Sequence, residues 1–221
     1  MRSLLRGRSV GDPGTKVWLR VGIGCRLFPF RMTASKRKSI APALPPARPG
    51  SVLGADFFDR DTLVVARALI GCNLCRDDGG IVRRWRITEV EAYDGHEDKA
   101  SHASRGRTAR NAPMFGPAGA WYVYLCYGVH WMLNIVTREA GYPAAILIRG
   151  AGPCSGPGIL TRELRVDKAL DGRPATPGTG LWIEDDGLAV PDAEVVRTPR
   201  IGVAYAGPDW SRRPYRFLWR R

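Results

Sequence analysis

Residues 73–93 read "NLCRDDGGIVRRWRITEVEAY", two runs that can form strands on either side of a turn. The turn signal is Asp77-Asp78-Gly79-Gly80, because acidic residues followed by glycines favour the tight turns of β-hairpins. Residues of one parity in the second run are Trp85, Ile87, Glu89, Glu91 and Tyr93. Since side chains alternate along a strand, we expect all five on one face, with both glutamates leaving the strand on the same side.

The segment before this hairpin, "DRDTLVVARALIG" at residues 59–71, predicts a helix. Asp61 is a suitable N-cap, apolar residues recur at helical spacing, and Gly71 ends the pattern. The folded region is expected to begin near Leu53.

A second hairpin is expected in "AWYVYLCYGVHWMLNIV", residues 120–136. The run is rich in β-branched and aromatic residues, and Gly128 is the expected bend. If the chain reverses there, Tyr124 and Asn134 have the same parity and lie on one face, where they could line a single pocket. Tyr127 is left at the tip.

Three further segments extend this pattern. "AAILIRG" predicts a strand that ends at Arg149 and Gly150. "SGPGILTRELRVDKAL" predicts a helix that begins at a proline, after a glycine-rich stretch whose backbone N–H groups suit an anion. The C-terminal residues, "TPRIGVAYAG" and "YRFLWRR", are expected to be short strands with basic residues between them.

The charge is concentrated at the N-terminus. Of the net charge of +13, residues 1–50 carry 11 Lys and Arg and one acid, which leaves 23 basic and 20 acidic residues in 51–221. We expect residues 1–50 to be a disordered basic tail and 51–221 to be one domain. An Arg-rich transit peptide and a start of translation at Met32 are both compatible with the tail. No apolar run of signal-peptide or membrane-spanning length is present.

The five cysteines and the acidic stretch "EVEAYDGHEDKASH" raise the question of a metal. Cys72 and Cys75 form a lone C-x-x-C with no second pair, so buried thiols in a reducing compartment are favoured over zinc or redox chemistry. Candidate ligands in the acidic stretch are Glu89, Glu91, His96, Glu97, Asp98 and His102, but they lack the spacing of known metal motifs. No metal or other cofactor is expected, and 96–98 are expected to be a solvated loop.

Several motifs together resemble those of the 3-methyladenine (alkyladenine) DNA glycosylase family. In order along the chain they are "TEVEAYDGHEDKASH", "RTARNAPMFGPAGAWYVYLCYGVHWMLNI", "ILIRG", "SGPGILT" and "PRIGV". The resemblance spans roughly Leu53 to Trp219. It implies a single-domain α+β fold around a curved, mostly antiparallel sheet, and a monofunctional enzyme that flips alkylated or deaminated purines, such as 3-methyladenine or hypoxanthine, out of duplex DNA and hydrolyses the N-glycosidic bond.

The resemblance also implies roles for individual residues. Glu91 matches the family's catalytic glutamate, and one carboxylate can both activate a water and compensate an oxocarbenium-like charge. Arg149 matches the arginine that helps to hold the water and the charge. The residues expected to recognise the flipped base are Tyr93, His102, Tyr124 and Asn134, the last by crowding the amino group of guanine.

The remaining expected contacts are with the DNA. Tyr127, an aromatic at an anchored bend, is expected to fill the gap that a flipped nucleotide leaves. Candidate phosphate contacts are Arg107, Arg110, Gly156 and Gly158. The family usually carries a further, largely helical segment between Arg149 and Ser155, of which this chain has only residues 150–154. An impaired, DNA-binding protein of the same fold is therefore the alternative to an active enzyme. We expect a monomer in the cytoplasm, at the nucleoid, or in the nucleus or mitochondrion of a eukaryote.

Overall fold

The computed structural model describes residues 48–220. The expected basic tail up to residue 47 and the alternative start at Met32 lie outside the described residues. The first described residue, Arg48, contacts the body of the protein: its carbonyl accepts a hydrogen bond from Nδ2 of Asn73 at 2.7 Å. No helix among the described residues is long and apolar enough to cross a membrane.

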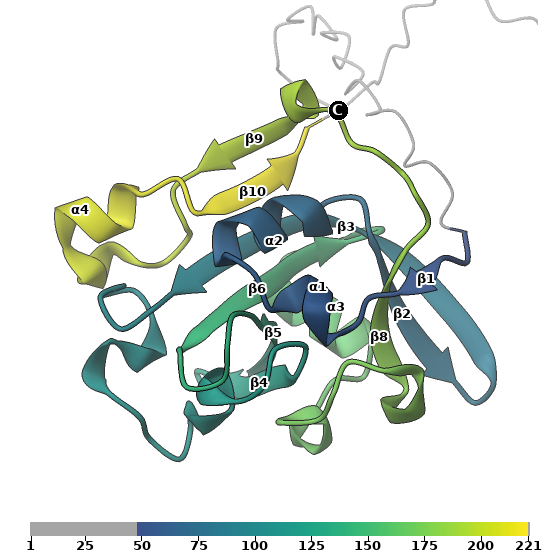
Figure 1. Cartoon of the computed structure of the whole chain (residues 1–221), viewed down its shortest axis with the longest axis horizontal. Helices are drawn as coiled ribbons and strands as arrows, with labels where there is room; N and C mark the ends of the chain where they lie inside the picture. Colours follow the sequence, from purple (N-terminus) through teal and green to yellow (C-terminus); the bar gives the residue numbers. More distant parts are fainter. Residues whose placement is uncertain (1–47, 221) are drawn as a thin grey trace, which may run out of the picture. The chain divides into compact units, whose positions relative to one another are not determined.

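Antiparallel strands dominate the described part (Figure 1). They are β1 (Ser51–Val52), β2 (Asn73–Asp78), β3 (Ile81–Asp94), β4 (Trp121–Cys126), β5 (His130–Val136), β6 (Ala144–Ala151), β7 (Cys154–Ser155), β8 (Leu181–Asp185), β9 (Val195–Thr198) and β10 (Arg216–Trp219). The order in the sheet is β1-β8-β2-β3-β6-β5-β4; β10 pairs with β3 and β9, and β7 pairs with β6. The α+β class with a mostly antiparallel sheet is confirmed.

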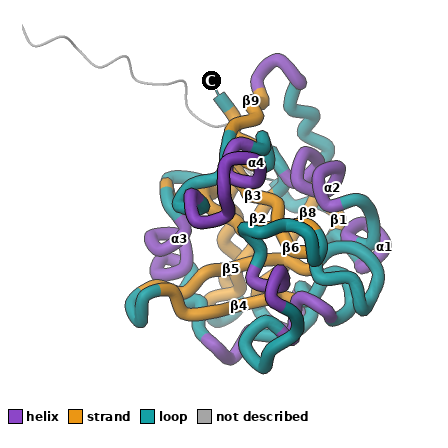
Figure 2. Tube along the Cα trace, turned by 90° about the vertical axis from the view of Figure 1, so that its left-hand side faces the viewer, coloured by secondary structure: helices purple, strands orange, loops and turns teal. Residues whose placement is uncertain are grey.

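The helices are short and lie around the strands (Figure 2). The α-helices are α1 (Ala55–Phe58), α2 (Thr62–Leu69), α3 (Pro157–Glu163) and α4 (Gly207–Arg212). The 3₁₀ helices are η1 (His102–Arg105), η2 (Ala112–Phe115), η3 (Lys168–Leu170), η4 (Pro177–Thr179), η5 (Asp192–Glu194) and η6 (Ala204–Ala206).

The local predictions for the first helix and hairpin are confirmed. The side chain of Asp61 accepts the N–H groups of Leu63 and Val64 and so caps α2. β2 and β3 pair from Asn73↔Arg86 to Asp78↔Ile81, which leaves two glycines in the turn. Both glycines have positive φ, 67° and 92°, the conformation that a two-residue hairpin loop of type I′ requires.

One strand prediction is wrong. Trp85 and Ile87 pack in the main core, whereas Glu89 and Glu91 face the other way. The register between β3 and β6 shifts on both sides of Glu89, and Thr88 has no directly opposed residue. Such a bulge inserts one residue into the alternation, so the side chains after it exchange faces. The two glutamates still share a face, as predicted.

The central strands pack one face against the main core, and their other face lies outside it. Residues of the core face include Val90, Ala92, Trp121, Val123, Leu133, Ile135, Ile146 and Ile148, all with 0% of their surface exposed. Leu69 of α2 and Leu160 of α3 join the same cluster. Residues of the opposite parity on β3, β6, β5 and β4 are therefore free to build a site on a rigid support.

The hairpin β4–β5 confirms the predicted reversal at Gly128. Cys126 pairs with His130, Tyr124 with Met132 and Tyr122 with Asn134. Gly128 has φ 69°, and the preceding tyrosine has φ 51°. The connection from β6 to β7 is shorter still, since Ala151 pairs with Cys154. A tight hairpin thus occupies the place where the sequence lacks the expected helical segment.

Two predicted elements differ in extent. The helix that starts at Pro157 ends at Glu163, because Arg165 has φ 50° and turns the chain. Residues 199–206 form no strand; they are irregular and end in η6. This segment contacts β3 and the loop after it through the side chain of Arg200 and the N–H of Ile201.

Candidate active site

The register of the sheet aligns four residues of the non-core face in one row. Glu91 of β3 is opposite Leu147 of β6, which is opposite Asn134 of β5, which is opposite Tyr122 of β4. Neighbouring strands are about 4.8 Å apart, so Glu91 and Asn134 stand about 10 Å from each other across the row. A planar ligand between them would have a carboxylate at one end and an amide at the other.

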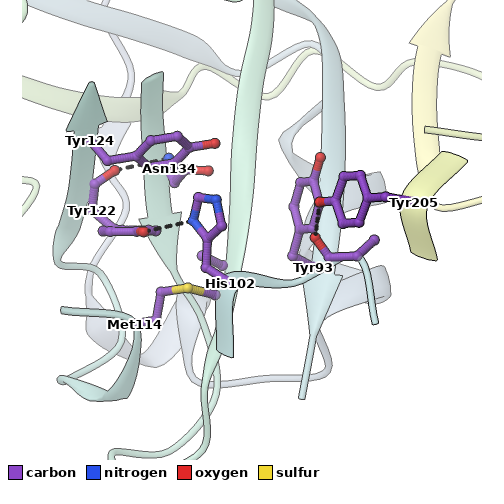
Figure 3. Close-up of a pocket in the computed structure, with 9 residues that line it drawn as sticks. Tyr93, His102, Met114, Tyr122, Tyr124, Asn134 and Tyr205 are labelled. Carbon is purple, nitrogen blue, oxygen red and sulfur yellow. Dashed lines mark hydrogen bonds between the residues drawn. The ribbon is translucent and has the colours of Figure 1, made fainter. Parts of the chain in front are cut away.

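A small pocket opens over this row (Figure 3). It encloses about 50 Å³, and its lining includes Tyr93, His102, Tyr122, Tyr124, Asn134 and Tyr205. It continues into a groove of about 840 Å³ that is also lined by Tyr127, Arg149 and Ile201. The pocket and the groove share Tyr93, His102, Tyr124 and Tyr205, so the pocket is open toward the groove.

Glu91 is completely buried beneath the groove and is held by three donors. The N–H of Ile201 donates to Oε1 at 2.7 Å, and the hydroxyl of Tyr93 donates to Oε2 at 3.0 Å. Nη1 of Arg149 also donates to Oε2, at 3.4 Å. A carboxylate has about four acceptor directions, so one remains, and it belongs to Oε1. The three partners themselves line the groove.

The environment raises the pKa of Glu91 above the ordinary value of a glutamate. Burial is the main cause, because it disfavours the charged form. The positive charge of Arg149 and the hydrogen bonds from Ile201 and Tyr93 act in the opposite direction, and the nearby charge of Glu89 adds to the rise. A raised pKa brings a carboxylate closer to the range in which a general base works near neutral pH.

Arg149 is itself fixed by a second carboxylate. Its Nε donates to Oε1 of Glu89 at 2.8 Å, and the same oxygen accepts a hydrogen bond from Nε of Arg216 at 2.7 Å. Arg149 lies in the irregular part of the β3–β6 pairing, where it has no directly opposed residue. The bulge therefore brings Glu89, Arg149 and Glu91 together.

Five aromatic side chains line the pocket: Tyr93, His102, Tyr122, Tyr124 and Tyr205. The rings of His102 and Tyr124 meet edge to face, with centroids 4.6 Å apart. Nδ1 of His102 and the hydroxyl of Tyr122 share a hydrogen bond of 2.9 Å. Desolvation by these neighbours, followed by the charge of Arg110, lowers the pKa of His102 and favours a neutral ring. Tyr93 stands on the opposite side of the pocket (Figure 3).

Asn134 is buried and its orientation is determined by its neighbours. Its Nδ2 donates to the carbonyls of Tyr122 and Met132 at 3.0 and 3.3 Å. Both partners are acceptors, so the NH₂ group must face them, and the amide oxygen belongs to the pocket side. The predicted pairing of Tyr124 and Asn134 on one face, lining one pocket, is confirmed.

Among the large hydrophobic side chains of the described residues, Tyr127 is the most exposed, with 96% of its surface in solvent. It lines the groove from the tip of β4–β5. A non-glycine residue in the left-handed region is uncommon, and such conformations concentrate at functional sites.

Of the two arginines predicted to bind phosphate, one lines the groove and the other does not. Arg110 lines the groove, lies 5.3 Å from the ring of Tyr124 and donates to the carbonyl of Leu125. Arg107 lies over Phe115 outside the groove lining. Lys99 and Arg105 also line the groove, and the sequence reasoning did not select them.

Pro157, the first residue of α3, lines the groove, and Gly156 and Gly158 stand on either side of it in the chain. The N–H of Gly156 already donates to the carbonyl of Arg149 at 2.9 Å, so it is not available to a phosphate. A Cβ on Gly158 would lie 2.9 Å from the ring of His130, which explains a glycine there by close packing.

The expectation that Asp98 belongs to a solvated loop is wrong. Asp98 and Arg200 form an ion pair with 0% of either side chain exposed. Their separation of 102 residues along the chain is the reason why the sequence did not reveal the pair. The sequence pattern did not predict Tyr205 and Ile201 as site residues either, although Ile201 lies in "PRIGV", one of the motifs that resemble the family.

The described residues contain no group of three or more His, Cys, Asp or Glu side chains that could hold a metal ion. Cys72, Cys75 and Cys154 are buried and Cys126 is half-buried, all as free thiols, which agrees with the predicted role of buried thiols; Cys25 lies outside the described residues. The ionised groups gathered beneath the groove are the carboxylates of Glu89 and Glu91 and the guanidinium of Arg149.

Comparison with known proteins identifies the group to which this arrangement belongs. The family model of methylpurine-DNA glycosylase (MPG) matches residues 56–156 and 151–221, two stretches that meet at the short β6–β7 connection. Proteins named "Putative 3-methyladenine DNA glycosylase" from Anaeromyxobacter dehalogenans (strain 2CP-C) and Methanocella arvoryzae are 47% and 45% identical to this chain. The alignments cover 74% and 75% of this chain and 81% and 91% of those proteins. The chain belongs to the methylpurine-DNA glycosylase family and is a DNA glycosylase, an enzyme of DNA repair.

Proposed function

We propose that this enzyme flips an alkylated or deaminated purine, of the 3-methyladenine or hypoxanthine type, out of double-stranded DNA and hydrolyses its N-glycosidic bond with a water activated by Glu91. The observation that carries the proposal is the environment of Glu91. It is a buried carboxylate with one unused acceptor direction, next to a pocket with aromatic walls.

The water would bind at the free direction of Oε1 and lose its proton to Glu91 as it attacks the anomeric carbon. The C–N bond breaks, and its electron pair leaves with the purine. The negative charge of Glu91 would compensate the positive charge that develops on the sugar. Arg149 would keep Glu91 ionised and in place, since Glu89 and Arg216 fix its guanidinium from the far side.

The base would be held by its faces. Tyr93 on one side could stack on any purine, and on the other side either His102 or Tyr124 could do so, since these two rings meet edge to face. Stacking contributes about 1–3 kcal/mol per base. An alkylated, cationic purine would gain roughly 0.5–2 kcal/mol more from the electron-rich rings. Such walls accept several lesions, and Asn134 would exclude guanine by crowding its amino group.

The duplex would bind along the groove, with Tyr127 in the gap left by the flipped nucleotide. Lys99, Arg105 and Arg110 line the groove and would contact phosphates. We propose a monomer as the active form. In a bacterial cell such an enzyme would work on the nucleoid, in the cytoplasm.

The test is the replacement Glu91→Gln, which keeps the shape of the side chain and removes the base. Single-turnover release of hypoxanthine and 3-methyladenine from a defined duplex should fall by about 10²–10⁴-fold or more, while binding to lesion DNA persists. Glu89→Gln is the matched control, because Glu89 lies two residues away, on the same face, and also contacts Arg149. It should lose much less activity than Glu91→Gln.

Retained excision by Glu91→Gln would end the assignment of the base. Equal losses in both variants would mean that the ion-pair network, rather than Glu91 itself, carries the reaction. A parent enzyme that binds lesion DNA and releases no base would favour the impaired, DNA-binding alternative.

A further inference from the structure

A buried ion pair lies behind the catalytic carboxylate and has no part in the reaction proposed above. Nη2 of Arg200 donates to Oδ1 of Asp98 at 2.8 Å, and Nη1 donates to Oδ2 at 2.5 Å. Asp98 also accepts the N–H groups of Asp94 and Ala100, so it fixes the loop that follows β3. The pair therefore fastens the segment 199–206 to the end of the strand that bears Glu91.

Arg200 reaches the surroundings of Glu91 in three ways. Its Nη1 also donates to the carbonyl of Ala92, the residue after Glu91, at 2.8 Å. Its guanidinium lies 4.7 Å from the centre of the Tyr93 ring, and the hydroxyl of that ring donates to Glu91. The next residue in the chain, Ile201, supplies the N–H that binds Oε1 of Glu91.

We propose that Arg200, held by Asp98, is a positioning residue for the catalytic carboxylate: it fixes the N–H of Ile201 and the ring of Tyr93, and through them the orientation and charge of Glu91. The inference rests on the proposed role of Glu91 as the base. Arg200 touches neither the substrate nor the reacting water in this arrangement.

Only an arginine has the geometry for these contacts. Its planar guanidinium binds both oxygens of Asp98 and the Ala92 carbonyl at once while its face packs on Tyr93, whereas a lysine offers one compact ammonium. Arg200→Lys therefore keeps the charge and loses the fixed geometry. Asp98→Asn keeps the shape of the partner and removes its charge.

The chain contains a matched control. Arg86 and Asp186 form another buried arginine–aspartate pair, with both contacts at 2.6 Å and side chains only 4% and 3% exposed. Arg86 also binds a backbone carbonyl, that of Gly71. It precedes the bulge in β3 and lines neither the pocket nor the groove. Arg86→Lys should therefore lower the melting temperature without changing the chemistry.

The expected direction of the pH effect follows from the groups around Glu91. They are Glu89 and Tyr93 on β3, Arg149 on β6, Tyr124 on β4, Arg216 on β10 through its contact with Glu89, and Arg200 with the N–H of Ile201 from the segment 199–206. The Ile201 hydrogen bond stabilises the charged carboxylate and lowers the pKa of Glu91. Its loss in Arg200→Lys raises that pKa, so the base becomes protonated at a higher pH.

The experiment compares the full-length parent, Arg200→Lys, Asp98→Asn and Arg86→Lys. Single-turnover excision of hypoxanthine is measured against pH, together with melting temperatures. Arg200→Lys and Asp98→Asn should slow excision by about ten- to a hundredfold at the parent's optimum. The acid limb of their pH profiles should move upward by about one pH unit. Arg86→Lys should keep the parent's rate and profile.

A second readout needs no DNA. In the parent, the amide resonance of Ile201 in ¹H–¹⁵N spectra should follow the titration of Glu91, and in Arg200→Lys this dependence should be lost. A rate and profile equal to the parent's, or a loss of stability alone as in Arg86→Lys, would overturn the inference. If Arg200→Lys does not fold, Asp98→Asn decides by the same measurements.

Failure of the proposed function gives a different result. If Glu91→Gln remains active, Glu91 is not the base, and the activity profiles no longer bear on Arg200. The Ile201 resonance then decides on its own: a dependence on Glu91 that survives in Arg200→Lys contradicts the positioning role, and one that disappears supports it.

Discussion

Asn134 shows how one side chain can serve the fold and the pocket with different atoms. Its nitrogen binds two backbone carbonyls within the β4–β5 hairpin, and its oxygen is left for the pocket. The nitrogen contacts prevent the amide from rotating. A fixed oxygen on the wall can then exclude a ligand by its position, which a mobile side chain could not do.

We predict that Asn134→Ser raises excision of guanine lesions relative to hypoxanthine. Serine is shorter, so the amino group of a guanine derivative no longer meets the wall. The measurement is the ratio of single-turnover rates on two duplexes that differ only in the lesion. The variant should also lose about 1–3 kcal/mol of stability, because the buried carbonyls of Tyr122 and Met132 lose their donor.

An unchanged ratio of rates would mean that Asn134 does not limit the substrate at this wall. If the melting temperature shows that the variant is stable, an unchanged ratio contradicts the proposed arrangement of the pocket. The rates are measured below the melting transition so that unfolding does not affect them.

The hairpin β4–β5 is the element that carries the DNA contact we propose. Its strands are anchored by Trp121, Val123, Leu133 and Ile135, which are completely buried. Its tip is a tight turn in which Val129 N–H donates to the carbonyl of Cys126 at 3.1 Å. A rigid support with an exposed aromatic at its end suits a residue that must hold its place in a base stack.

We predict that Tyr127→Ser leaves folding almost unchanged and weakens nucleotide flipping. Unstacking a base costs a few kcal/mol, and serine cannot fill the vacated space. A fluorescent base analogue beside the lesion should show a smaller change than with the parent enzyme. The defect should be milder on a mispaired lesion, where less pairing energy opposes flipping.

Ile81→Ser is the control for this variant. Ile81 is 70% exposed at the start of β3, beside the turn of the other hairpin, and does not line the groove. It should flip the lesion as the parent does. Equal fluorescence amplitudes for Tyr127→Ser and the parent on both duplexes would leave Tyr127 as a packing residue of the turn.

The charge of the whole molecule gives little indication of where DNA binds. Outside residues 1–50 the net charge is only +3, and many charged side chains of the described part are paired with each other. Lys99, Arg105 and Arg110 line the groove and take part in no ion pair among residues 48–220. These three cations thus lie at the groove where we propose that DNA binds.

We predict that the double replacement Lys99→Gln and Arg105→Gln lowers the salt dependence of DNA binding. Each phosphate contact contributes about 0.9 to the slope of log K against log salt, so the slope should fall by about two. Arg165→Gln with Arg213→Gln is the control, since it removes the same charge from residues that pair with Asp78 and Asp209 outside the groove. Equal changes in both double variants would contradict a localised contact surface.

The sequence by itself determined the features that depend on neighbours along the chain. The cap at Asp61, the Gly79-Gly80 turn and the reversal at Gly128 each need only a few consecutive residues, and all three are present. The same alternation of side chains placed Tyr124 and Asn134 in one pocket. The motifs around Glu91 and Arg149 identified the family, and their assigned roles stay predictions.

Only the tertiary structure decided how Glu91 is held. The bulge at Thr88 depends on the pairing of β3 with β6, and it separates Ile87 from the glutamates although all have the same parity. In the sequence, Asp98 resembles an exposed acidic residue of a loop. In the structure it is buried in an ion pair with Arg200, which comes from a distant segment. Burial depends on which remote segments pack together, and no short stretch of sequence contains that information.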